Sequence, residues 1–143
     1  MTTTLEVDER PRLLRLRAPM LVAGGVLAAS VLLHVRDPHQ SGSWGLCPWL
    51  LLTGTYCPGC GGLRAVNDLT RGDVAGAASS NLLLVATVPL LATWWARSVL
   101  DRWRGPGRPV DGRLAVTACV VLGVLAVGFA VLRNTGAGAW LAP

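Results

Sequence analysis

Three of the four cysteines lie close together, in the segment CPWLLLTGTYCPGC that begins at residue 47. Cys47, Cys57 and Cys60 give the spacing C-x9-C-x2-C. A Cys-Pro-Gly-Cys turn lets two thiolates converge on one ion, as in the knuckle of a zinc ribbon. The spacing therefore predicts a metal site, with zinc as the cofactor that these ligands suit.

A structural zinc site has four ligands, and the three cysteines leave one position to fill. His39 lies in a polar, turn-rich stretch of the same region and is the candidate fourth ligand. His34 is the alternative, although it stands at the end of an apolar segment. The turn around His39 is explained equally well by loop structure alone.

The same cysteines also suit redox chemistry. Cys57 lies just before a predicted helix, whose N-terminal dipole stabilises a thiolate, and C-P-x-C is a pattern of dithiol oxidoreductases. Cys47 would then exchange a disulfide with the Cys57–Cys60 pair. No thioredoxin-like βαβ pattern surrounds the motif, which argues against that enzyme class. A third interpretation is a disulfide or packing turn that only shapes the loop.

The rest of the chain indicates a membrane protein. Hydrophobic residues make up 52% and charged residues 15%, against roughly 25% charged in average soluble domains. Three uncharged stretches, residues 18–35, 74–96 and 114–132, are long enough as helices to cross a bilayer. Pro89 predicts a kink in the second. We therefore predict an all-α integral membrane protein with three transmembrane helices.

The arginines predict the orientation of these helices. Nine of the thirteen fall in residues 1–17 and 97–113, and four in residues 36–73 and 133–143. Positive residues are enriched on the cytoplasmic side. We expect a cytoplasmic N-terminal tail, an Arg-rich cytoplasmic loop, a Cys-rich extracytoplasmic loop and an extracytoplasmic tail, in the cell inner membrane. A cleaved signal peptide is the competing interpretation of the first stretch, and it also leaves the cysteines outside.

The Cys-rich loop contains two further predicted segments. Residues 47–56 are apolar but too short to span, which suits an interfacial or re-entrant segment. Residues 60–71 predict a short amphipathic helix, because polar residues recur at i, i+3, i+4 and i+7. That polar stripe is expected on the surface, with an ion pair at i, i+4. Its members are Arg64, Asn67, Asp68 and Arg71.

Two polar residues mark the start of the second span. Asp73 follows Gly72 and is predicted as the N-cap of the helix. Asn81 lies one or two turns further on, where its amide is expected to cap or to bond across helices. We therefore expect both residues to have structural roles and not chemical ones.

The motif C-P-x8-C-P-G-C-G-x-x-R-A, followed by G-D-x-x-x-A and an Asn, runs from Cys47 to Asn81. It resembles the bacterial domain-of-unknown-function family 2752, small multi-pass membrane proteins with a C-P-x-C-G-x-T-R-A core. Leu63 and Leu82 replace the Thr and Pro usual in the family. The resemblance implies a bacterial membrane protein and places Arg64, Asp73 and Asn81 at motif positions, with Asp68 between them. It implies no established activity.

These features predict a small multi-pass membrane protein whose Cys loop is a structural or metal-binding knuckle, organising a surface that faces lipid or a partner. The alternative is a membrane thiol–disulfide oxidoreductase using Cys57 and Cys60. The predicted partners are the bilayer and either another membrane protein or a second copy. Nucleic acid is not expected, because the arginines flank apolar blocks, and nucleotide is not expected, because the chain has no Lys for a phosphate loop.

Overall fold

The computed structural model describes residues 11–40, 42–45, 47–105 and 112–143. Those residues form helices and turns, with no strand among them, so the predicted all-α class is confirmed. The helices are α1 (Arg12–Val35), α2 (Pro48–Thr53), α3 (Gly62–Thr70), α4 (Val74–Arg104), α5 (Gly112–Arg133) and the 3-10 helix η1 (Gly136–Leu141).

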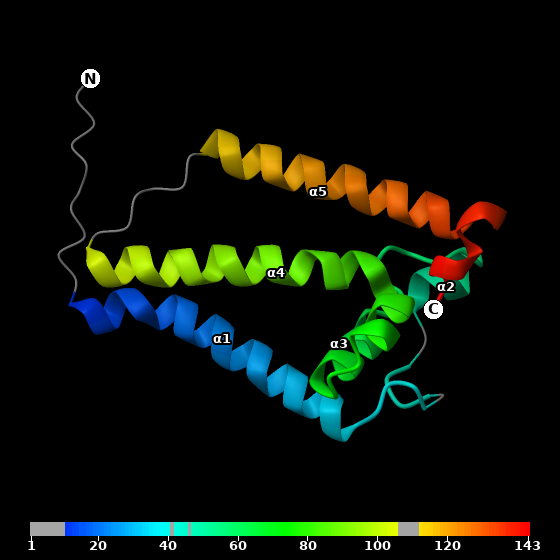
Figure 1. Cartoon of the computed structure of the whole chain (residues 1–143), viewed down its shortest axis with the longest axis horizontal. Helices are drawn as coiled ribbons and strands as arrows, with labels where there is room; N and C mark the ends of the chain where they lie inside the picture. Colours follow the sequence, from blue (N-terminus) through cyan, green and yellow to red (C-terminus); the bar gives the residue numbers. More distant parts are fainter. Residues whose placement is uncertain (1–10, 41, 46, 106–111) are drawn as a thin grey trace.

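Three of these helices, α1, α4 and α5, are long and apolar enough to cross a membrane. Figure 1 shows α1 and α5 running in one direction and α4 in the other. The short helices α2, α3 and η1 gather at one end, opposite the end where α4 finishes. The Cys-rich loop and the segment after α5 therefore lie on the same side of the three long helices.

The helices differ in length from the apolar stretches that predicted them. α1 begins at Arg12 and α4 continues to Arg104, whereas the predicted spans began at residue 18 and ended at residue 96. The short helix in the loop covers residues 62–70 and not 60–71. Arginine is a good helix former, so the charge that ends an apolar stretch does not end the helix.

The second long helix is interrupted at Asn81, whose backbone angles are φ −159° and ψ 93°. Asp73 caps the first part, accepting a hydrogen bond from the Gly76 N–H at 2.7 Å. Asn81 caps the second part, since its Oδ1 accepts from the Leu84 N–H at 2.9 Å. The helix is thus interrupted at Asn81, where a polar side chain replaces the lost backbone bonds. The kink at Pro89, which lies inside the same helix, stays a prediction.

The polar face of α3 points into the protein. Asn67 and Asp68 are 1% and 8% exposed, whereas Leu63 on the other face is 47% exposed. The Asn67 amide donates to the carbonyl of Leu33 at the end of α1 (2.7 Å) and accepts from Arg71 (3.0 Å). The middle of the polar stripe is therefore turned inward, the reverse of a helix on a soluble protein, while Arg71 at the end of the stripe stays exposed.

The predicted surface ion pair between Arg64 and Asp68 is wrong for the same reason. Asp68 instead accepts from the Ser80 hydroxyl at 3.0 Å and bonds the ring of His39 at 2.8 Å. Arg64 donates from Nε to the Pro38 carbonyl at 3.5 Å. Because this part of the helix is buried, Asp68 bonds both the loop and α4 and does not pair with Arg64, one turn earlier on the same helix.

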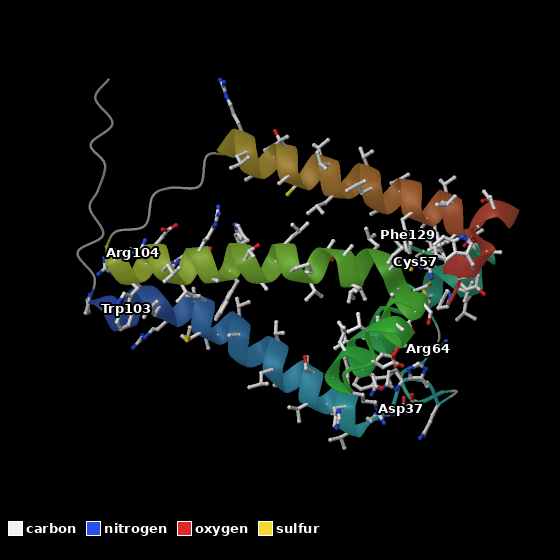
Figure 2. All side chains as sticks on the ribbon, in the orientation of Figure 1. Asp37, Cys57, Arg64, Trp103, Arg104 and Phe129 are labelled. Atoms are coloured by element: carbon white, nitrogen blue, oxygen red, sulfur yellow. The ribbon has the colours of Figure 1, made fainter. Side chains whose placement is uncertain are left out.

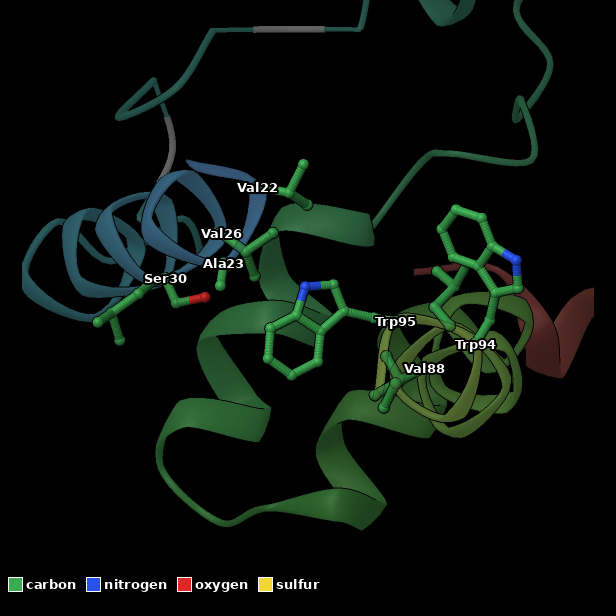
Figure 3. A pocket seen from close by; sticks show the side chains of 10 residues that line it. Val22, Ala23, Val26, Ser30, Val88, Trp94 and Trp95 are labelled. Carbon is green, nitrogen blue, oxygen red and sulfur yellow. The ribbon is translucent and has the colours of Figure 1, made fainter. Parts of the chain in front are cut away.

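Helices α1 and α4 pack at the end where α1 begins and α4 finishes, and they diverge toward the other end, where α3 lies between them (Figure 1). Trp95 donates from its indole N–H to the Pro19 carbonyl at 3.1 Å. A cavity of about 550 Å³ opens beside this contact, with almost wholly apolar walls that include Val26, Val88 and Trp94 (Figure 3). Only an apolar occupant, such as a lipid chain, suits walls of this kind.

Helix α5 meets the rest of the described chain mainly at its C-terminal end, where η1 folds back on it and contacts α4. No residue in the most apolar 18-residue window of α5 is buried. A helix with that much exposed apolar surface requires lipid around it. The contacts at its C-terminal end therefore attach α5 to the other helices.

The inverted face of α3 leads to a stability prediction. Asn67→Ala should destabilise the protein by about 1–2 kcal/mol, because the buried Leu33 carbonyl loses its donor and Arg71 loses an acceptor. Leu63→Ala, at an exposed position of the same helix, should cost less than about 0.5 kcal/mol. Thermal unfolding of the detergent-solubilised variants measures both. A larger loss for Leu63→Ala would contradict the inverted orientation.

Candidate metal centre

The sulfurs of Cys47, Cys57 and Cys60 lie within 4.8 Å of one another. Cys47 Sγ is 3.7 Å from Cys57 Sγ, which is 3.1 Å from Cys60 Sγ. All three cysteines are free thiols. Thiolates bound to tetrahedral zinc at about 2.3 Å stand roughly 3.8 Å apart, so the cluster has the dimensions of a three-cysteine metal site.

Local backbone structure brings the three sulfurs together. Cys47 is the N-cap residue of α2, and Pro48 occupies the first position of that helix, where a missing N–H costs nothing. Cys57 and Cys60 close a tight turn, with the Cys60 N–H donating to the Cys57 carbonyl at 3.1 Å. The turn leads directly into α3, whose N-cap is Gly61.

Gly61 lets this turn approach α4 closely. Its φ is +79°, and a Cβ at this position would overlap the backbone carbonyl oxygen of Ser80 and lie 2.8 Å from Pro143. Asn81, the next residue of α4, donates to the carbonyls of Pro58 (2.9 Å) and Cys60 (3.1 Å). The cysteine turn therefore packs against α4 at Asn81, where that helix is interrupted.

Arg133, at the end of α5, is the second support of the turn and is 2% exposed. Its NH1 donates to the carbonyls of Cys57 and Cys60, both at 3.1 Å, and its NH2 donates to Leu141 at 3.0 Å. The guanidinium also lies over the rings of Tyr56 (5.6 Å) and Phe129 (4.9 Å). Figure 2 shows Cys57 and Phe129 together where α5 and η1 meet the loop.

Asn134 continues this attachment one residue further along. Its amide accepts from the Tyr56 N–H and donates to the Tyr56 carbonyl, both at 2.8 Å. The side chain thus pairs with the backbone of the residue that precedes Cys57. Arg133 and Asn134 together join the end of α5 to the Cys loop.

The electrostatic setting of the three thiols is uneven. Burial, followed by the neighbouring Cys57 thiol, raises the pKa of Cys60 to about 12. The Leu50 backbone N–H in the first turn of α2, followed by the Cys60 thiol, lowers the pKa of Cys47, although no full capping hydrogen bond forms there. Without metal, Cys47 is therefore a stronger acid than Cys60.

The predicted site residues fall into two groups. The three cysteines come together, and Asn81 supports them. His39 lies outside the cluster, with its Nε2 on Asp68, and His34 bonds Thr70 at 2.9 Å. Asp73 caps α4. Neither histidine is placed by these contacts as a fourth ligand.

Arg133 and Asn134 were not predicted as part of the site. The sequence assigned them to a tail, because the cluster lies some 75 residues earlier in the chain. One signal was present: an arginine directly after an uncharged 19-residue stretch, on the side where arginines are few.

The three cysteines open onto a groove of about 610 Å³. Arg64, on α3, lines the same groove, as do Trp44, Leu50 and Tyr56. The described residues give Arg64 one hydrogen-bond partner, the Pro38 carbonyl at Nε. The groove therefore combines sulfur atoms, apolar walls and a guanidinium group.

Comparison with known proteins agrees with the motif. Residues 47–95 match the family described as protein of unknown function (DUF2752). The predicted resemblance is confirmed over this segment, which contains all three clustered cysteines, α3 and most of the described α4. No curated protein and no solved structure matches the chain. Arg133 and Asn134 lie outside the matched segment.

The close approach at Gly61 predicts a large effect of a single methyl group. Gly61→Ala should destabilise the protein by about 3 kcal/mol or more, combining the left-handed backbone with overlap against Ser80. Gly72→Ala is the matched control: its φ is +80° but the space around it is open, so about 1–2 kcal/mol is expected. Thermal unfolding in detergent compares them, and equal losses would exclude the close contact.

The pKa differences predict the order in which the thiols react. In reduced, chelator-treated protein at pH 8, Cys47 should react with iodoacetamide at least about tenfold faster than Cys60, because a lowered pKa leaves more thiolate and a raised pKa leaves less. Between pH 7 and pH 10 the Cys60 rate should keep rising while that of Cys47 levels off. Peptide mass spectrometry reads both rates. Faster labelling of Cys60 would contradict this electrostatic setting.

Proposed function

We propose that Cys47, Cys57 and Cys60 bind one zinc ion and that this centre holds the Cys loop on the end of α5. The observation that carries the proposal is the buried guanidinium of Arg133 on the carbonyls of two of the three clustered cysteines. The protein would then be a non-enzymatic membrane protein, whose metal knuckle organises its outer surface.

Charge balance supports a metal over three neutral thiols. A cation that is 2% exposed is costly unless an opposite charge is near. Among the described residues the side-chain ion pairs are His39–Asp68 and Arg71–Asp37, so no carboxylate accompanies Arg133. Zinc with three thiolates carries a net charge of −1, which balances the guanidinium.

The membrane helices indicate where the metal-binding loop would lie. The three apolar helices suit a lipid bilayer, and the distribution of arginines supports a cytoplasmic N-terminus in the cell membrane with the cysteines outside. Helix α2, whose N-cap is Cys47, has no buried residue and exposes Trp49, Leu51 and Leu52. Metal binding at Cys47 would fix this short apolar helix at the membrane surface, in line with an interfacial segment.

A second candidate function is thiol–disulfide exchange, favoured by the 3.1 Å separation of the Cys57 and Cys60 sulfurs. Their oxidation would form one disulfide and pass two electrons and two protons to a partner disulfide, leaving two thiols there. Zinc binding and this reaction require the same sulfurs, so they exclude one another in a single state of the protein.

The zinc proposal predicts the metal content of the full chain. Protein purified in detergent without chelator should contain about one zinc per chain by plasma mass spectrometry. Cys60→Ser should lose most of it. Arg133→Gln should weaken zinc binding by about 10- to 100-fold, as expected for a group that orients metal ligands.

Cys119→Ser is the matched control, because Cys119 lies in α5 and is exposed outside the cluster. It should retain full zinc. Metal-free wild-type protein with a reversible Cys57–Cys60 disulfide, seen by thiol trapping, would instead support the redox function and contradict the zinc centre.

A further inference from the structure

The zinc centre of the preceding section has three protein ligands among the described residues. Metal sites with three protein ligands keep the fourth position for an exogenous group, whereas closed structural sites use four. All three cysteines line one groove of about 610 Å³, a volume within the usual range for small-molecule sites. An exogenous ligand therefore has a route to the metal.

Arg64 indicates what kind of ligand the groove would take. It lines the groove with the cysteines, and its described hydrogen bond uses Nε alone, at 3.5 Å from the Pro38 carbonyl. The two terminal nitrogens of the guanidinium are the groups that bind a carboxylate in paired hydrogen bonds. Trp44 and Leu50 supply apolar walls to the same groove.

The donor atom follows from the metal site. A centre held by three thiolates is soft, and sulfur is the donor that such a centre prefers. When the thiol binds, its S–H proton is released to solvent and the zinc centre changes from −1 to −2, of which Arg133 balances one charge. Arg64, which lines the groove, is the cation available to bind the carboxylate. Nothing else in the described groove carries a positive charge.

We propose that the groove binds a small thiol carrying a carboxylate, with its sulfur in the fourth position on the metal and its carboxylate on Arg64. This inference rests on the proposed zinc centre. It makes the centre an open, ligand-exchanging site and assigns Arg64 to ligand selection.

The experiment uses the full chain in detergent, loaded with Co²⁺ in place of zinc. The sulfur-to-cobalt absorption is titrated with 3-mercaptopropionate and, separately, with the neutral thiol 2-mercaptoethanol. Both should raise the absorption, and 3-mercaptopropionate should bind about tenfold more tightly, the ratio that about 1.4 kcal/mol of added interaction gives.

Arg64→Ala should remove this preference and leave binding of 2-mercaptoethanol unchanged, which also shows that the variant is folded. Arg71→Ala, at the C-cap of the same helix and outside the groove, should keep the preference. A cobalt centre that responds to neither thiol, or a preference that survives Arg64→Ala, would overturn the inference while leaving the metal centre intact. Failure of the reduced protein to bind Co²⁺ would overturn both.

Discussion

The contact on which this structure depends is that of Arg133 with the cysteine turn. One buried guanidinium binds the carbonyls of Cys57, Cys60 and Leu141, and it lies against Tyr56 and Phe129. Helix α5 has little other packing on the described chain, so this contact attaches the third long helix to the first two. It also places a positive charge beside three sulfurs, where the ionisation of those sulfurs decides its cost.

The lipid that surrounds the long helices explains the other unusual features of the structure. Lipid favours apolar side chains on the outside, so α3 turns Asn67 and Asp68 inward and exposes Leu63. The polar groups then bind one another: Asp68 joins the loop to α4, and Asn67 closes the end of α1. A pattern that would predict a surface stripe in water becomes an internal network, and the cysteine turn is built against it through Asn81.

Much of this could be predicted from the chain alone. Long uncharged stretches determine helices in a bilayer, and the short Pro-Gly turn brings the sulfurs of Cys57 and Cys60 together. Which face of α3 is buried could not be predicted. Periodicity shows that the helix has a polar stripe, but not whether that stripe contacts water or the protein interior. A kink was predicted at Pro89, but the interruption of α4 at Asn81, where an amide can both cap a helix and hold a turn, was not predicted. Arg133 was missed because only the tertiary fold brings residue 133 to residues 57 and 60.

The central claim is that three cysteine thiolates hold a zinc ion in a centre of net charge −1, which Arg133 balances. Zinc X-ray absorption of the detergent-purified full chain, in buffer free of thiols, tests it most directly. The account predicts a shell of three sulfurs at about 2.3 Å and one lighter donor. A zinc environment of nitrogen and oxygen alone would contradict it.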